Sequence, residues 1–360
     1  MKRGNNMDRI KRLSQQLPEN IDAALITSEV NRRYYTGFVS SAGTLLVTRK
    51  EAVLLLDSRY VEAGSKKVTD AKVMLMTDMA KQLNELFEEF GVKTVGIESG
   101  YMTVESLFSL RRTLNVTILD EPYLNEVILK QRCIKSAEEM QEIRAAQAIT
   151  DKAFLHMLDI IKPGLVEKDL QLELDYFMLK NGATGLAFET ILAAGANGSM
   201  PHAVPGLNKV KEGDFVTMDF GAAHNGYCSD MTRTVAVGKI SEEQKKVYDL
   251  VYKAQTSAID AVRAGVPCNS IDAVARDMIY KAGYEGKFGH GLGHSLGLEI
   301  HENPRFSPLC DVITEAGMVL SVEPGIYLEG RFGVRIEDIV EITENGCDVI
   351  TKSEKKLITL

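Results

Sequence analysis

Two stretches of the chain share a strand-turn-strand pattern that contains acidic residues. In residues 214–235, apolar positions alternate with polar ones on both sides of Asn225-Gly226, a pair typical of a tight hairpin turn. Residues 318–340 repeat this pattern around a glycine-rich turn. Each predicted arm carries an acid among its strand-like residues, namely Asp219, Asp230, Glu323 or Glu337. The repeat predicts an internal duplication in which two acid-bearing hairpins face each other.

Strand-like and helix-like runs alternate in the first third of the chain. The strand-like runs lie at residues 22–27, 43–48, 52–57, 71–76 and 93–98, and the amphipathic helix-like runs at 79–90 and 102–113. This alternation predicts an α/β domain. The region has no histidine and no G-x-G-x-x-G motif, and Asp57 and Arg59 are expected to form a plain ion pair.

The pattern lapses between residues 114 and 132, where Glu121-Pro122 is expected to interrupt it. We therefore predict two domains, residues 1–123 and 124–360. In the second, Ser136 and Glu139 form a capping-box sequence that opens a helix to about residue 161. Further helices are expected at residues 166–181, 241–264 and 269–282. These helices would flank a curved sheet built mainly from the two hairpins.

Composition and charge limit the kinds of molecule that this protein is expected to bind. The chain has 360 residues, 45% of them hydrophobic, so it can bury a large core, and its net charge of −8 argues against binding nucleic acid or an anionic membrane. The five cysteines are scattered and never spaced C-x-x-C, which is typical of a reducing compartment. No signal peptide or membrane span is evident, so we expect a cytoplasmic protein.

The acids and histidines together predict a metal site. Four buried carboxylates that converge would raise one another's pKa values, and two divalent cations would relieve this conflict. Four histidines lie in glycine-rich segments, namely His202, His290, His294 and His301, whereas His156 and His224 are expected to be structural. Oxygen ligands with few nitrogens favour Mn²⁺, Co²⁺ or Fe²⁺ over a structural zinc. Hydrolysis of an amide by a metal-activated water is the natural chemistry.

Five motifs in this order resemble the dinuclear-metal "pita-bread" peptidases, which include Xaa-Pro aminopeptidase, Xaa-Pro dipeptidase (prolidase) and methionine aminopeptidase. The motifs are D-F-G, S-D-M-T-R-T, G-H-G-L-G-H with H-E-N-P, V-E-P-G-I-Y and V-R-I-E-D. The resemblance covers essentially the whole chain. It implies a creatinase-like α/β domain followed by an α+β pita-bread domain, with a pseudo-two-fold and a mainly antiparallel curved sheet.

The resemblance also implies a role for each motif residue. Asp219 would bind one metal ion, Asp230 and Glu337 would bridge two, and His294 and Glu323 would complete the other. Glu323 is similar to the family's general base, which acts on a metal-bridging hydroxide or water. The remaining matches are to catalytic or substrate-side residues, namely His202, His301, His290 and Arg335. Arg335 could equally be a plain salt-bridge partner, and Glu299 and Glu302 are expected to be structural.

Two further stretches of the first domain bear on the substrate. N-R-R-Y-Y-T-G-F-V-S-S-A-G and L-L-L-D-S-R-Y are similar to stretches of bacterial Xaa-Pro aminopeptidases, although Ser58 stands where glycine is commoner. We therefore expect removal of the N-terminal residue from peptides with proline second, with two Mn²⁺ preferred over Co²⁺ or Zn²⁺. Prolidase activity is the alternative, and a catalytically silent binding homologue is a third. The resemblance further implies a homodimer or homotetramer.

Overall fold

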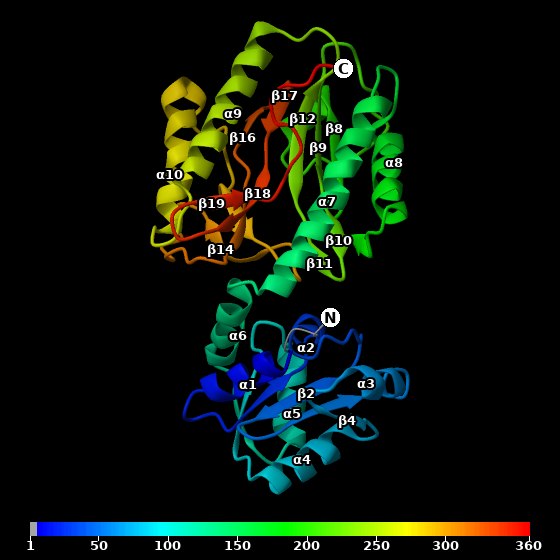
Figure 1. The fold of residues 1–360 in the computed structure, drawn as a ribbon, viewed down its shortest axis with the longest axis vertical. Coiled ribbons are helices and arrows are strands. Elements are labelled where there is room, and N and C mark those ends of the chain that lie inside the picture. The colour runs from blue at the N-terminus through cyan, green and yellow to red at the C-terminus, as the bar shows by residue number, and fades with distance from the viewer. Residues whose placement is uncertain (1–5) are drawn as a thin grey trace. The chain divides into compact units, whose positions relative to one another are not determined.

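The computed structural model describes residues 6–360, and the chain divides into two compact units (Figure 1). The first unit extends to Arg132 and the second covers Cys133–Leu360. Tyr123, where the sequence suggested a boundary, is the first residue of helix α6 (Tyr123–Cys133). Among the described residues, no helix combines the length and the apolar character that crossing a membrane requires.

The first unit is the predicted α/β domain. Its six-stranded sheet has the order β4-β3-β2-β1-β5-β6, with antiparallel pairing of β2 to both neighbours and parallel pairing elsewhere. The strands are β1 (Ala23–Ile26), β2 (Thr44–Thr48), β3 (Ala52–Leu56), β4 (Lys72–Leu75), β5 (Thr94–Ile97) and β6 (Thr117–Leu119). The helices are α1 (Asn6–Gln16), α2 (Glu29–Thr36), α3 (Val61–Lys67), α4 (Met79–Phe90), α5 (Val104–Thr113) and α6.

Residues 114–132, where the sequence pattern lapses, contain β6 and most of α6, two elements that the sequence analysis did not predict. The expected breaker Glu121-Pro122 lies between these two elements, and Pro122 stands directly before α6, where its carbonyl accepts the Glu126 N–H at 2.9 Å. Proline is tolerated at a helix start because the first N–H groups of a helix have no intrahelical partner. The expected ion pair between Asp57 and Arg59 is present, at 2.7 Å.

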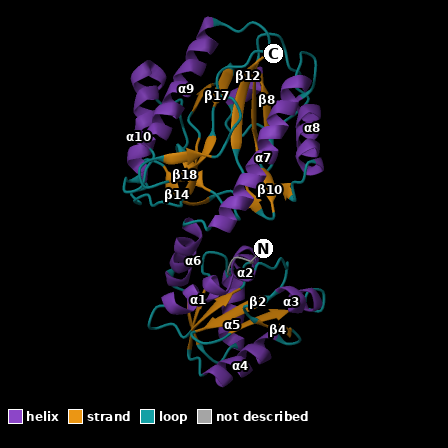
Figure 2. Ribbon diagram, in the orientation of Figure 1, coloured by secondary structure: helices purple, strands orange, loops and turns teal. Residues whose placement is uncertain are grey.

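The helices of the second unit follow the predicted ranges closely. Ser136 caps α7 and Ser241 caps α9, and in both cases the complete capping box is present. The helices are α7 (Ala137–Ile160), α8 (Glu167–Lys180), α9 (Glu242–Ala261) and α10 (Cys268–Ile279), together with the short turns η1 (Gly195–Ser199) and η2 (Tyr280–Tyr284). In Figure 2, α7 and α8 lie on one side of this unit's strands, and α9 and α10 lie on the other.

Both acid-bearing segments of the second unit are hairpins, as predicted. In the first, β9 (Phe215–Phe220) pairs with β12 (Met231–Ala236), and the tip is formed by β10 (Ala222–His224) and β11 (Tyr227–Cys228). Asn225 and Gly226 both have positive φ at the turn. In the second hairpin, β15 (Val319–Val322) pairs with β18 (Asp338–Ile342), and the tip is formed by β16 (Gly325–Leu328) and β17 (Phe332–Arg335).

The remaining strands extend the two hairpins into antiparallel sheets. They are β7 (Gly185–Leu186), β8 (Ile191–Ala194), β13 (Gly293–Ser295), β14 (Glu302–Phe306) and β19 (Cys347–Val349). β8 lies beside β9, and β13 lies beside β15. All strand pairs in this unit are antiparallel, so the predicted sheet type is confirmed.

Each helix pair has its own hydrophobic core against the strands. Side chains such as Phe154 of α7 and Leu174 of α8 pack with Met218 of β9, and all three are at most 1% exposed. Val251 of α9 packs in a separate cluster with Val322 of β15. Each hairpin is thus held against a helix pair by apolar burial, which is the main stabilising term in folding.

Gly221 separates β9 from β10, and we predict that Gly221→Ala destabilises the second unit. A Cβ atom there would lie 2.0 Å from the carbonyl oxygen of Ser229, so the backbone of the hairpin would have to move. Overpacking of this kind costs about 1–3 kcal/mol. Denaturant unfolding should show the loss, whereas Gly346→Ala, whose Cβ would meet nothing within 4 Å, should leave stability unchanged. Equal stability of the two variants would contradict this.

Candidate active site

A cleft of about 860 Å³ in the second unit contains every residue that the sequence analysis assigned to the site. Its lining includes Asp219, Asp230, His294, Glu323 and Glu337, together with His202, His290, His301 and Arg335. These residues come from positions up to 135 apart in sequence, from His202 to Glu337, and the two hairpins and the segments beside them bring them together. His156 and His224 lie outside the cleft lining and contact Glu173 and Glu142, respectively.

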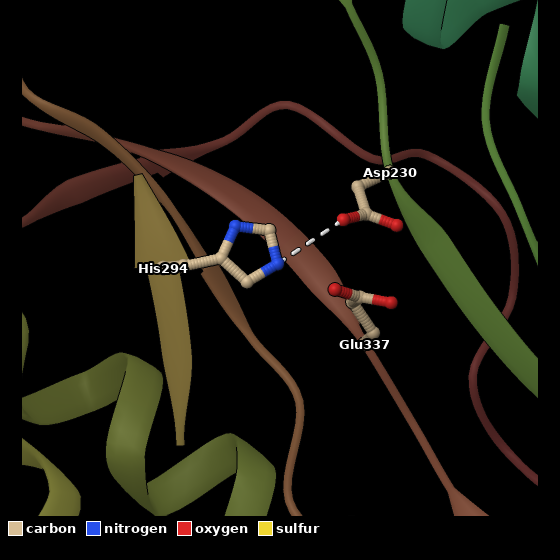
Figure 3. A group of neighbouring side chains, drawn as sticks. All are labelled: Asp230, His294 and Glu337. Carbon is tan, nitrogen blue, oxygen red and sulfur yellow. Dashed lines mark ion pairs between the residues drawn. The ribbon is translucent and has the colours of Figure 1, made fainter. Parts of the chain in front are cut away.

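Three of these side chains form a compact group of potential metal ligands. Asp230, His294 and Glu337 each offer an atom within 4.8 Å of the others, and Figure 3 shows them pointing toward one another from three different strands or strand ends. His294 Nε2 lies 3.5 Å from a carboxylate oxygen of Asp230 and 3.5 Å from one of Glu323. Glu323 therefore lies next to the same group.

Breaks in the strand pairing position the acids. Asp219 lies within β9, but Asp230 and Glu337 are the residues immediately before β12 and β18, so the expectation that every acid lies within a strand was wrong. Glu323 directly follows β15. At each break, the strand pairing at the base of a hairpin ends and the pairing at its tip begins. The side chains of Asp230, Glu323 and Glu337 therefore need not follow the regular alternation of a strand.

The two hairpins are joined at the level of the acids. The Glu337 N–H donates to the carbonyl of Thr232 at 3.1 Å, and the Thr232 hydroxyl donates to the Glu337 carboxylate at 2.8 Å. Behind them, the buried Arg233 donates to the carboxylate of Asp338 at 2.7 Å. These bonds fix the separation of the facing strands.

Burial makes the ionised carboxylates costly in this protein. Burial raises the pKa values of Asp230 and Glu337 far above their usual range, and the neighbouring acids raise them further. Burial also raises the pKa of Glu323 to about 8. By contrast, burial lowers the pKa values of His290 and His294 to about 4, so both are neutral at pH 7 and suited to act as ligands or acceptors.

Arg335 is the only guanidinium bonded to a carboxylate of the predicted site, as far as the described residues show. It donates to Asp219 at 2.6 Å, to the Thr232 hydroxyl at 3.0 Å and to the Tyr327 hydroxyl at 2.8 Å. The Tyr327 hydroxyl lies 2.9 Å from His290 Nε2, and His290 Nδ1 lies 2.8 Å from the Gly291 carbonyl. Since a carbonyl can only accept, Nδ1 carries the proton and Tyr327 donates to Nε2.

The sequence analysis missed Tyr327, Thr232 and Arg305. Tyr327 lies within the quoted V-E-P-G-I-Y motif, but its contact with His290 depends on the loop before β13 meeting β16, where the Tyr327 N–H donates to the Lys287 carbonyl at 3.1 Å. Arg305 lines the cleft from β14, where it lies opposite His294 in the strand register. Glu302, expected to be structural, is buried and ion-paired with Lys135 at 3.0 Å.

A helix-flanked antiparallel sheet that buries carboxylates and a histidine at one cleft defines a metallopeptidase of the pita-bread class. Residues 141–344 match metallopeptidase family M24, and residues 9–134 match the creatinase/prolidase N-terminal domain. The chain therefore belongs to metallopeptidase family M24.

Several known proteins are similar over nearly the whole chain. The Xaa-Pro dipeptidase of Pyrococcus horikoshii is 35% identical, with 98% of this chain and 99% of that protein covered. A solved structure of an Xaa-Pro dipeptidase from Bacillus anthracis is 39% identical, covers 99% of this chain and 100% of that one, and has a TM-score of 0.95. An X-Pro aminopeptidase structure from Thermotoga maritima is 34% identical, covers 98% and 100%, and has a TM-score of 0.89.

The carboxyl pKa values predict how divalent metal changes the pH dependence of stability. Between pH 6.5 and about 8, the folded metal-free protein keeps a proton on Glu323 that the unfolded chain, with an ordinary pKa of 4.5, has released. Stability must therefore fall as pH rises through this window, by on the order of 2 kcal/mol per such group. His290 and His294, with pKa values lowered from 6.5 to about 4, oppose this fall weakly, because the unfolded chain releases about half a proton from each as pH rises from 6.5 to 8, which adds about 0.4 kcal/mol of stability per histidine.

Thermal unfolding of chelator-treated protein at pH 6.5 and 8 measures this effect. The melting temperature should fall over this range without metal and stay level with Mn²⁺ added, because bound cations keep the carboxylates ionised. The variant Glu323→Gln/Glu337→Gln should show a smaller fall. A metal-free protein that gains stability toward pH 8 would contradict the prediction.

Proposed function

We propose that this chain is a metal-dependent Xaa-Pro dipeptidase, which hydrolyses the peptide bond before proline in a dipeptide. The observation that carries the proposal is the buried group of Asp230, His294 and Glu337 in a cleft. The same cleft contains Arg305, whose side chain forms no hydrogen bond or ion pair with another described residue. The sequence alone favoured an aminopeptidase, but the relatives named as dipeptidases support the alternative better.

The site residues fit a pair of divalent cations. One carboxylate oxygen of Asp230 is fully buried and has no hydrogen-bond partner, which is costly unless a cation binds there. Asp219, Asp230, His294, Glu323 and Glu337 would hold the two ions. When bound, such ions polarise a carbonyl and lower the pKa of water to near neutrality. Oxygen ligands with a single imidazole suit Mn²⁺.

Glu323 and three further residues of the predicted site have proposed tasks in the reaction. Glu323 accepts the proton of the attacking water and returns it to the leaving nitrogen, as a general base and then a general acid. His202 and His301 line the cleft and donate hydrogen bonds to the reacting carbonyl oxygen and the departing group. Burial lowers the pKa of His301, which keeps its ring neutral at pH 7. Arg335 neutralises Asp219 and orients Tyr327.

Arg305 supports recognition of a free proline carboxylate. Its side chain lines the cleft, is exposed, and forms no hydrogen bond or ion pair within the described part of the chain. The other cationic groups are less suited, since Arg335 is bonded to Asp219 and Lys168 to Gln171. A guanidinium binds a carboxylate through two parallel hydrogen bonds, and a dipeptide presents this carboxylate directly after proline.

Xaa-Pro aminopeptidase activity is the second candidate, favoured by the similarity to the Thermotoga maritima structure. The two activities differ in whether chain beyond proline is accepted. Mn²⁺ as the physiological ion, a cytoplasmic location and a homodimeric or homotetrameric state stay predictions. A silent binding homologue is disfavoured because the whole predicted acid and histidine set lines one cleft.

A substrate comparison tests the proposed activity. With Mn²⁺ added, the protein should cleave Ala-Pro at least about tenfold more efficiently than Ala-Pro-Ala, because only the dipeptide offers its carboxylate at the proline. Liquid chromatography of the products measures both. Asp230→Asn should lose nearly all activity on either substrate. Preferred cleavage of Ala-Pro-Ala would make the aminopeptidase the better assignment, and full activity of Asp230→Asn would contradict the metal site.

Arg305→Ala tests the recognition of the carboxylate. We expect KM for Ala-Pro to rise by about 10- to 100-fold, since a charge-assisted bidentate contact is lost, with a smaller change in kcat. Cleavage of Ala-Pro-amide, which has no carboxylate, should be affected much less. Arg263→Ala, an arginine outside the cleft lining, is the matched control. Equal losses for Ala-Pro and Ala-Pro-amide would show that Arg305 does not read the carboxylate.

A further inference from the structure

Glu167, the first residue of α8, is a completely buried carboxylate that no part of the proposed chemistry uses. Its Oε1 accepts from the Ala194 N–H at 2.7 Å and from the Asn208 side-chain amide at 2.9 Å. Its Oε2 accepts from the Asn197 side-chain amide at 2.9 Å and from the Gly206 N–H at 3.2 Å. All four donors therefore belong to residues 194–208.

The charge of Glu167 is held by neutral donors alone. No lysine, arginine or histidine in the described part of the chain forms an ion pair with it. Its place in the first turn of α8 contributes some stabilisation through the helix dipole. Burying an unpaired carboxylate is expensive, whereas an apolar side chain could fill the same space at less cost. The arrangement is thus suited to fixing the shape of residues 194–208.

This segment carries His202 to the cleft. The loop is tied on its other side by weaker contacts, in which the Gly330 N–H donates to the Ser199 hydroxyl at 3.2 Å and Arg335 donates to the Pro201 carbonyl at 3.4 Å. The His202 side chain itself makes no hydrogen bond to another described residue. Its ring is therefore placed by the backbone of the loop and not by contacts of its own.

We infer that Glu167 is a positioning residue for the reaction, which acts through His202 by clamping both ends of the loop that carries it. This inference rests on the proposed function of His202 as a donor to the reacting groups. A displacement of about 1 Å at a catalytic group can lower the rate by as much as 100-fold, so a clamp remote from the substrate can matter.

Glu167→Gln is the informative substitution. Each carboxylate oxygen of Glu167 accepts two hydrogen bonds. In either orientation, the NH₂ group of the glutamine would therefore face two donors, and only two of the four hydrogen bonds would remain. We expect kcat for Ala-Pro to fall about tenfold with less than about a threefold change in KM. Glu173→Gln, on the same helix but bonded to His156, should behave like the wild type. Asn197→Ala removes one donor and provides a milder variant should Glu167→Gln fold poorly.

A double-mutant cycle with His202→Ala separates positioning from general damage. His202→Ala alone should lower kcat about 100-fold, and adding Glu167→Gln should then change it less than about twofold. Equal proportional losses with and without His202 would overturn the inference. So would full activity of His202→Ala, which would remove the role of His202 while leaving the peptidase assignment intact.

Hydrogen exchange tests the clamp independently of activity. In Glu167→Gln, amides of residues 194–208 should exchange at least about tenfold faster, while those of β9 and β15 keep their protection. Unchanged exchange in the loop would overturn the inference. If the wild type cleaved no Xaa-Pro peptide, the proposed function would fail, and this measurement would still decide whether Glu167 holds the loop.

Discussion

The constraint on which this structure depends is the burial of several carboxylates in one small volume. Burial raises the pKa values of Asp230, Glu323 and Glu337, and neighbouring acids, Asp219 among them in every case, raise these values further. Arg335 lies close by but bonds directly to Asp219, so it leaves the other acids only partly compensated. When ionised, these carboxylates would move apart in a flexible fold, because like charges in a low dielectric repel strongly. The surrounding fold must therefore be stiff.

The stiffness comes from contacts between the hairpins. Thr232 bonds both the backbone and the carboxylate of Glu337, which ties β12 to the segment before β18. Arg233 and Asp338 form a buried ion pair behind this contact, and Lys355 donates to the other oxygen of Asp338 at 2.7 Å. Breaking such a pair would leave an unpaired buried charge, which typically costs 3–5 kcal/mol. The acids thus face each other because separating the hairpins would break the buried ion pair between Arg233 and Asp338.

The sequence predicted the parts of this arrangement that are encoded locally. Asn225-Gly226 specifies a turn through its positive φ angles, and the capping box at Ser136 marks a helix start by itself. The sequence did not predict contacts that depend on which strands and loops lie side by side. The bond between Tyr327 and His290 requires the loop before β13 to meet β16, and Arg305 reaches the cleft only because β14 lies opposite β13. Such pairings are set by tertiary structure, which short-range patterns do not contain.

Under the proposed function, the residues of the reaction and the residue that recognises the substrate carboxylate lie in different surroundings. The acids are buried, and a change to any of them disturbs a network in which every charge affects its neighbours. Arg305 is exposed on β14, its side chain forms no hydrogen bond or ion pair with another described residue, and its substitution is expected to affect the fold little. One scaffold can therefore keep its site while the preference for a dipeptide or a longer peptide changes at its edge. The solved structures of a dipeptidase and of an aminopeptidase both match this chain over nearly its whole length, so the fold alone does not distinguish the two activities.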